Sequence, residues 1–158
     1  MTTLKTGEKA PDFKGTDQNG NAVALSDFKG KKVVLFFYPK ASTPGCTAEA
    51  CDLQNNIERF TKENYQIIGV SADSQKRQLN FATKNNLNYP LITDEDKIII
   101  EAYGVWGPKK FMGREYDGIH RTTFIIDEKG IIEEVISKVK TKEHTSQILK
   151  QIDINLRV

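Results

Sequence analysis

The chain has 158 residues, of which 38% are hydrophobic and 28% charged, and we expect a single domain over residues 1–158. Its formal net charge of +2 is too small to favour nucleic acid or an anionic membrane as a partner. The longest apolar run, residues 33–38, is too short to cross a bilayer, and the opening Met-Thr-Thr-Leu-Lys lacks the apolar segment of a signal peptide. We therefore expect a cytoplasmic protein with neither a membrane nor a nucleic-acid partner.

The hydrophobic pattern predicts alternating strands and helices. Turn signals at Asn19-Gly20-Asn21 and Lys29-Gly30 indicate a small hairpin near the start of the chain. A buried strand is predicted at 31–38, followed by a helix at 44–62, a strand at 66–71 and a helix at 74–86 with Leu79 and Ala82 facing inward. A short strand at 91–93, a short helix at 95–103 and a Gly-rich loop at 105–120 come next. The chain then forms a hairpin of strands 122–126 and 131–137 and a helix at 142–152. This order is typical of an α/β fold, with a mixed central sheet and helices on both of its faces.

Both cysteines lie in one short segment, Y-P-K-A-S-T-P-G-C-T-A-E-A-C, at residues 38–51. Thr43 is placed to cap the predicted helix and Pro44 occupies its first position, so Cys46 lies in the first helical turn. Free backbone N–H groups and the positive end of the helix dipole favour a thiolate there, and thiolate is the reactive form of cysteine. Because a structural disulfide is not expected in a reducing compartment, two neighbouring cysteines favour redox chemistry or metal binding.

The spacing of apolar residues predicts which way each cysteine points. An inward stripe of an amphipathic helix is formed by Cys46, Ala50, Leu53, Ile57 and Phe60. Cys46 therefore points toward the protein body, and Cys51 lies off that face. Taken alone, an inward cysteine is also compatible with a plain core residue. A zinc site is a weaker alternative because His120 and His144 lack the paired spacing of a metal-binding motif, and we predict no metal.

The helix also predicts how far apart the two sulfurs are. Residues five apart in an unbroken helix have Cα atoms about 8–9 Å apart and point in different directions. A disulfide needs Cα atoms within about 7 Å. We therefore expect the folded helix to hold Cys46 and Cys51 apart, and a bond between them to require local unwinding near residues 44–52.

Four segments of the chain carry a recognisable pattern. They are P-x-x-x-T-P-G-C-T at 39–47, E-A-C at 49–51, Y-G-V-W-G-P-K-K-F-M-G at 103–113 and Y-D-G-I-H-R-T-T-F-I-I-D at 116–127. Together they resemble the peroxiredoxins, specifically the bacterioferritin comigratory protein or Q-type subfamily. The resemblance extends over essentially the whole chain. It implies a thioredoxin-like three-layer sandwich and a monomer.

The resemblance also implies an activity, the reduction of hydrogen peroxide or an organic hydroperoxide. At the matching positions, Cys46 would be the peroxidatic cysteine and Cys51 the resolving cysteine of an intramolecular disulfide. Thr43 and Arg121 would complete the peroxide pocket, and Pro39 would shield it. Thioredoxin would be the reductant, and no metal or organic cofactor would be needed.

The residues themselves leave some roles open. Arg121 at the start of a strand is also compatible with a surface arginine. Glu49 is compatible with a first-turn helix charge favoured by the dipole, or with a carboxylate that orients Arg121. We expect His120 to be a structural or surface residue and His144 to be a packing or capping residue near the last helix.

Two other classes of function compete with a peroxidase. A thiol–disulfide oxidoreductase on a similar fold is the first, but such proteins usually carry C-x-x-C, which places both sulfurs at one helix start. A binding or chaperone module that uses the fold as a scaffold is the second. A binding or chaperone module should keep its full activity in a Cys46→Ser variant, whereas a peroxidase should lose its turnover of peroxide.

Overall fold

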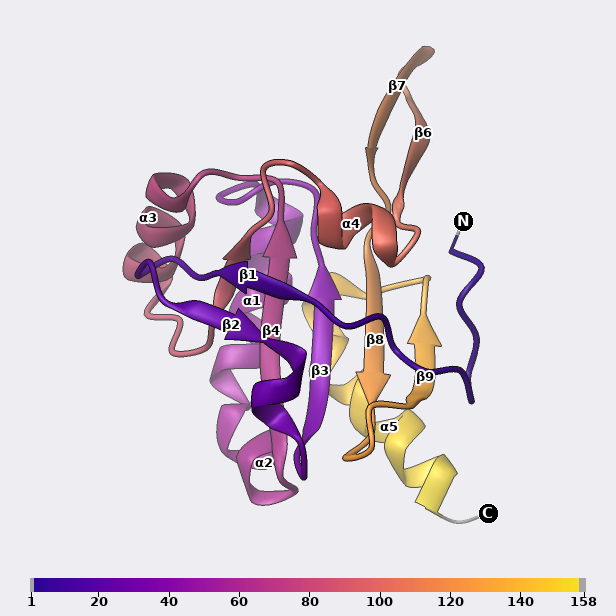
Figure 1. The fold of residues 1–158 in the computed structure, drawn as a ribbon. Helices are drawn as coiled ribbons and strands as arrows, with labels where there is room; N and C mark the ends of the chain where they lie inside the picture. Colours follow the sequence, from indigo (N-terminus) through magenta and orange to yellow (C-terminus); the bar gives the residue numbers. More distant parts are fainter. Residues whose placement is uncertain (1, 157–158) are drawn as a thin grey trace.

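The computed structural model describes residues 2–156 and is built around a mixed five-stranded sheet with the strand order β5-β4-β3-β8-β9 (Figure 1). The strands of this sheet are β3 (Lys32–Phe37), β4 (Tyr65–Ser71), β5 (Leu91–Thr93), β8 (Thr122–Ile126) and β9 (Ile132–Ile136). The helices are α1 (Pro44–Asn55), α2 (Ile57–Lys62), α3 (Gln75–Asn85), α4 (Ile98–Ala102) and α5 (His144–Leu156), with short 3-10 turns η1 (Leu25–Phe28) and η2 (Thr141–Glu143). Two hairpins complete the fold, β1 (Lys14–Thr16) with β2 (Ala22–Ala24) and β6 (Trp106–Phe111) with β7 (Arg114–Ile119).

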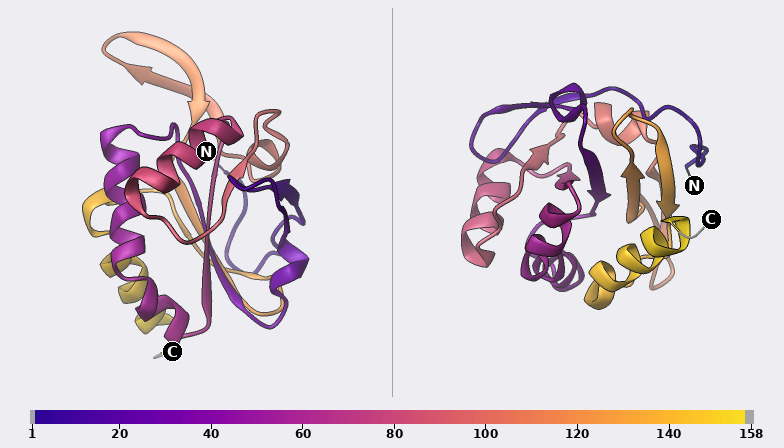
Figure 2. Two further views of the ribbon diagram at one scale, coloured as in Figure 1. Left: turned by 90° about the vertical axis from the view of Figure 1, so that its left-hand side faces the viewer. Right: turned by 90° about the horizontal axis from the view of Figure 1, so that it is seen from below.

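Helices lie against one face of the sheet, and the first hairpin and α4 lie against the other (Figure 2). An apolar layer fills the space on each face. Alternate residues of β3 point to opposite faces, as a strand requires. Val34 and Phe36 pack with α1, α2, α3 and α5, while Leu35 and Phe37 pack with η1, α4 and the first hairpin. The predicted three-layer α/β arrangement with a mixed sheet and a small N-terminal hairpin is confirmed.

The register of β3 determines which residues meet at the upper edge of the sheet in Figure 1. β3 runs parallel to β4 and antiparallel to β8, and Phe37 at its end pairs with Thr122 at the start of β8. The segment that follows β3 therefore lies beside the segment that precedes β8. This topology brings residues from 38–46 close to Arg121, although they are far apart in the sequence.

Three predictions about helices were wrong. The helix expected at 44–62 is divided into α1 and α2 at Asn56, which has φ −116° and ψ 16° and whose side chain donates to the Asp52 carbonyl oxygen at 2.8 Å. Leu79 is 42% exposed, because Phe81 and the polar Gln78, together with Ala82, form the buried side of α3. The helix expected at 95–103 is confined to α4, whose first residue, Ile98, is 71% exposed.

The segment at 105–120 is a β-hairpin and not the predicted loop. β6 and β7 pair in continuous antiparallel register and project away from the main sheet, as Figure 1 shows. The glycines that suggested a loop occupy strand positions or the turn. Most of the hairpin is exposed, so its strands lack the apolar alternation from which a strand is usually predicted.

The turn of this hairpin allows a test of local stability. Met112 and Gly113 connect the two strands, with φ values of +52° and +79°. A two-residue turn with positive φ at both positions favours Asn-Gly, and methionine is poorly suited to it. Met112→Asn is expected to stabilise the hairpin by about 0.5–1 kcal/mol, measured as slower amide exchange in β6 and β7. Lys110→Asn, which introduces asparagine at an ordinary position of β6, serves as the control. Equal amide exchange of β6 and β7 in the two variants would contradict the explanation.

Among residues 2–156, no helix combines the length and the apolar character that a membrane crossing requires.

Candidate active site

Cys46 is presented by the junction between β3 and α1. Thr43 has the extended backbone of an N-cap residue, Pro44 is the first residue of the helix, and Cys46 follows in the first turn. The predicted position of Thr43 is therefore correct, but its side chain makes no capping bond. Its hydroxyl instead donates to the Lys40 carbonyl oxygen at 2.8 Å. This bond holds the loop that contains Pro39, which is half-buried.

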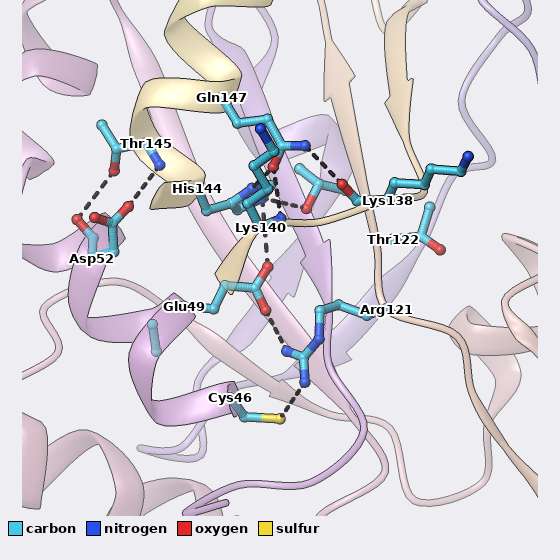
Figure 3. Close-up of polar contacts among 12 residues, drawn as sticks. Cys46, Glu49, Asp52, Arg121, Thr122, Lys138, Lys140, His144, Thr145 and Gln147 are labelled. Atoms are coloured by element: carbon cyan, nitrogen blue, oxygen red, sulfur yellow. Dashed lines mark hydrogen bonds and ion pairs between the residues drawn. The ribbon is translucent and has the colours of Figure 1, made fainter. Parts of the chain in front are cut away.

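Arg121 bridges two residues of α1, as Figure 3 shows. One guanidinium nitrogen, Nη2, donates to Cys46 Sγ at 3.3 Å, and the other, Nη1, donates to Glu49 Oε1 at 2.7 Å. Cys46 is only 1% exposed and Glu49 is fully buried, while the Arg121 side chain is 21% exposed. Of the two roles that the sequence left open for Glu49, the geometry agrees with the one that holds Arg121.

Gly45 makes room for this bridge. A Cβ atom at position 45 would lie 3.3 Å from Arg121 Nη2. That spacing is tighter than an ordinary carbon–nitrogen contact, so a side chain here would displace the guanidinium. Glycine at position 45 therefore leaves the Arg121 guanidinium room beside the sulfur.

Arg121 also reaches solvent on its other side. With Lys109 and His120, it lines a pocket of about 600 Å³. Burial alone would lower the pKa of Arg121, but the charges and hydrogen bonds of Cys46 and Glu49 raise it overall. Burial and the charge of Arg121 lower the pKa of Lys109. The guanidinium is therefore a fixed positive charge between a buried sulfur and an open pocket.

The buried position of Glu49 disfavours the charged form of its carboxyl group. Burial raises the pKa of its carboxyl group from 4.5 to about 7, although Arg121 opposes the shift. Between those two values, the folded protein keeps a proton that the unfolded chain releases. The contribution of this group to stability is therefore complete below about pH 4.5 and is lost as the pH rises through about 7.

This titration predicts the pH dependence of stability in a Glu49→Gln variant, which cannot lose the proton. Relative to the native chain, the free energy of unfolding of Glu49→Gln should rise by roughly 2–3 kcal/mol between about pH 5 and about pH 8. Urea denaturation of both proteins at the two pH values measures the difference. A difference in stability that stays constant with pH would contradict this assignment.

Cys51 lies on another side of α1. It is partly exposed, and its thiol donates to Asn85 Oδ1 at 3.5 Å, near the end of α3. Burial raises the pKa of the Cys51 thiol. Both cysteines are free thiols within the intact helix α1, as expected when the helix holds them apart.

A buried polar network supports the loop before Cys46, and the sequence analysis missed it. Asp73 Oδ2 accepts from the Ala41 backbone N–H and from the Ser71 hydroxyl, both at 2.7 Å. Gln78 donates to Ser71 Oγ at 2.9 Å and accepts a hydrogen bond from the Tyr38 hydroxyl. Ser71 and Asp73 come at the carboxyl end of the strand predicted at 66–71. Such ends commonly hold site residues in α/β proteins, so their position was the available signal.

The described residues contain no group of three or more histidine, cysteine or acidic side chains arranged to hold a metal ion. The groups in contact at the start of α1 are the sulfur of Cys46, the guanidinium of Arg121 and the carboxyl group of Glu49.

Comparison with known proteins is consistent with this arrangement. A family model described as the AhpC/TSA family matches residues 6–135. Peroxiredoxin Bcp of Escherichia coli strain K12 is 46% identical over 149 residues, which cover 94% of this chain and 96% of that protein. The chain belongs to the peroxiredoxins of the AhpC/TSA family.

Further relatives agree with this membership. Peroxiredoxin Bcp of Bacillus subtilis strain 168 is 45% identical over 150 residues, covering 95% of this chain and 96% of that protein. A solved structure of the Xanthomonas campestris bacterioferritin comigratory protein superimposes with a TM-score of 0.86 at 31% identity, covering 98% of this chain and 99% of the other. The fold of this peroxiredoxin is therefore the thioredoxin-like fold of its relatives, and the protein is a thiol-dependent peroxidase.

Proposed function

We propose that this peroxiredoxin reduces hydroperoxides through Cys46, forms an intramolecular disulfide with Cys51 and is recycled by thioredoxin. We further propose that it acts as a single-domain monomer in the cytoplasm, without a metal or an organic cofactor. The observation that carries the proposal is the guanidinium of Arg121, which contacts Cys46 Sγ and Glu49 Oε1 at the start of α1.

In the first step, the Cys46 thiolate attacks one peroxide oxygen. A sulfur–oxygen bond forms, the O–O bond breaks, and its electron pair leaves on the departing oxygen. That oxygen takes up a proton and leaves as an alcohol, or as water when the substrate is hydrogen peroxide. Arg121 stabilises both the thiolate and the departing oxygen because its donors are already oriented.

Thr43 and Pro39 have supporting roles. The Thr43 hydroxyl proton is used in its bond to the Lys40 carbonyl, so its oxygen can accept a hydrogen bond from the peroxide O–H. Such a bond would align the peroxide for attack. Pro39 lies on the same loop, and we assign to it the exclusion of water from the reacting sulfur.

In the second step, the Cys51 thiol attacks the Cys46 sulfenic acid. A disulfide forms, and the sulfenic oxygen leaves as water. A dithiol of the thioredoxin class then reduces the disulfide to two thiols and is itself oxidised. Because resolution consumes the sulfenic acid, it should protect Cys46 from further oxidation.

The relatives support an organic substrate in addition to hydrogen peroxide. The Xanthomonas campestris structure is described by the alkyl peroxide reduction activity of that protein. In this chain, the pocket of about 600 Å³ beside Arg121 offers room for an organic substituent.

The test is the intact mass of the reduced protein after one equivalent of hydrogen peroxide, followed by non-reducing peptide mapping. Loss of two hydrogens and a Cys46–Cys51 link is the expected result. Addition of one oxygen would mean that Cys46 reacts but Cys51 does not resolve it. An unchanged mass would overturn the proposal, and insulin reduction without peroxide would favour the thiol–disulfide oxidoreductase.

Formation of the disulfide is expected to unwind the first part of α1. Both cysteines are in an intact helix in the reduced form, and that geometry is incompatible with a disulfide. Oxidation should therefore increase amide exchange over residues 44–52 by at least about tenfold. Cys51→Ser, which cannot form the bond, is the control and should keep the exchange of the reduced helix after treatment with peroxide. Equal protection in the oxidised and reduced native protein would contradict the prediction.

A further inference from the structure

Behind Arg121, the carboxyl group of Glu49 faces a second buried titratable side chain, His144. Glu49 Oε2 lies 3.5 Å from His144 Nε2, and both side chains are fully buried. Among the described residues, Oε2 has no hydrogen-bond partner within normal distance, whereas Oε1 is occupied by Arg121. Figure 3 shows the continuous series from Cys46 through Arg121 and Glu49 to His144. The two proposed reaction steps leave Oε2 and His144 without a role.

The surroundings of His144 determine which ring nitrogen carries a proton. Gln147 Nε2 donates to the Lys138 carbonyl oxygen at 2.8 Å, and Gln147 Oε1 accepts from the Lys140 backbone N–H at 3.0 Å. These two bonds fix the orientation of the Gln147 amide. Its Oε1 atom is 2.9 Å from His144 Nδ1, so Nδ1 must be the donor. Nε2 is then the nitrogen that can gain or lose a proton, and it is the one that faces Glu49.

A neighbouring hydroxyl group allows both states of Nε2. Thr123 Oγ1 lies 2.7 Å from His144 Nε2. It can donate to an unprotonated Nε2 or accept from a protonated one, because a hydroxyl group does both. Without a proton on Glu49 or Nε2, the pair carries one negative charge and Oε2 is a buried oxygen with no donor, which is costly. With one proton on either atom, the pair is electrically neutral.

We propose that Glu49 and His144 share one proton, and that the charge of this buried pair controls how much of the positive charge of Arg121 acts on Cys46. His144 is then a positioning residue for the peroxide reaction, since it acts through Glu49 and Arg121 and does not touch the substrate. This inference rests on the proposed role of Cys46 for its effect on the rate, but the shared proton itself does not depend on that role.

The electrostatics of the pair agree with this assignment. Burial raises the pKa of Glu49 to about 7 and lowers that of His144 to about 4, so the shared proton resides mainly on Glu49 near neutral pH. Two macroscopic titrations belong to such a pair and not to either residue alone. Other titratable or charged groups that act on the pair are Asp52 on α1, Arg121 before β8 and Tyr89 before β5, and Cys46 lies beyond Arg121.

The direction of the effect on catalysis follows from the charges. When the pair holds its proton, no net negative charge offsets Arg121, which then stabilises the thiolate and the departing oxygen fully. When the proton is lost, the pair gains a negative charge beside the guanidinium. The rate constant for oxidation of Cys46, divided by the fraction of thiolate, should therefore fall by roughly tenfold as the pair loses its proton.

The first test is an NMR titration of the histidine ring signals, which does not require activity. The chain contains two histidines, so His120→Gln identifies the signals of His144. In the native protein, these signals should shift through the neutral range as the pair titrates. In Glu49→Gln, which cannot lose a proton, that transition should disappear. The same titration curve in both proteins, or no neutral transition in the native protein, would overturn the shared proton.

The second test is stopped-flow oxidation of Cys46 by hydrogen peroxide across the same pH range, with the thiolate fraction measured by its ultraviolet absorbance. The roughly tenfold fall with pH should occur in the native protein and be absent from Glu49→Gln. In His144→Gln, where Glu49 still titrates but an amide N–H can donate to Oε2, the fall should move to lower pH. A structural role alone would lower the rate equally at every pH and would contradict the proposal. If Cys46 is not oxidised at all, the proposed function fails, while the NMR titration still decides whether the pair shares a proton.

Discussion

Cys46→Ser is expected to lower the rate constant for peroxide reduction by at least about 10⁴-fold. A serine hydroxyl group is not ionised near neutral pH, and its oxygen cannot accept the peroxide oxygen as sulfur does. The substitution is small, and Cys46 contacts Arg121 through its sulfur alone, so the fold should be retained. Consumption of hydrogen peroxide coupled to oxidation of thioredoxin measures the effect.

Cys51→Ser is the matched control for this variant. It should keep one rapid oxidation of Cys46 for each chain and lose most of the thioredoxin-linked turnover, because the sulfenic acid has no internal partner. If Cys46→Ser retained turnover and Cys51→Ser lost it completely, the assignment of the two cysteines would be reversed. Full turnover in both variants would remove Cys46 and Cys51 from the reaction.

Arg121→Ala is expected to slow the oxidation of Cys46 by about 10²–10³-fold, a loss typical of removing a fixed charged donor from a reacting centre. The same change leaves the buried Glu49 without its cation, so stability should also fall. Arg121→Lys should retain part of the rate. An ammonium group provides charge, but it lacks the planar fork that reaches Cys46 Sγ and Glu49 Oε1 together.

The measurement is stopped-flow oxidation of the reduced protein, with the pH and ionic strength held constant. Arg114→Ala, which removes an exposed arginine of the projecting hairpin, is the control and should react at the native rate. An unchanged rate in Arg121→Ala would remove Arg121 from the reaction and leave the start of α1 as the main stabiliser of the thiolate.

Much of the fold could be predicted because the sheet is strongly patterned. The segments at 33–38 and 67–71 are buried on both faces, and short runs rich in β-branched and aromatic residues favour central strands. The hairpin at 106–119 could not be predicted in the same way, since its exposed residues show no alternation. The break at Asn56 was also missed, because the apolar stripe continues from Leu53 to Phe60 across it.

From residue patterns alone, the site could be predicted only where its residues are neighbours in the sequence. The position of Cys46 at a helix start follows from Thr43 and Pro44, and the resemblance to the peroxiredoxins brought in Arg121. The contact between Arg121 and Glu49 depends on the pairing of β8 with β3, which periodicity does not show. His144 was expected to pack or cap, and its proximity to Glu49 comes from the way α5 lies on α1.

The break at Asn56 divides what would be one long helix into α1 and the shorter α2. The cost of unwinding a helix grows with the number of residues released. If oxidation loosens residues near Cys46 and Cys51, the disruption can end at residue 55. Phe60 in α2 then keeps its packing against Tyr65 at the start of β4. In the proposed disulfide cycle, this interruption of the backbone would limit the conformational cost of each turnover, because the core around Phe60 need not be released.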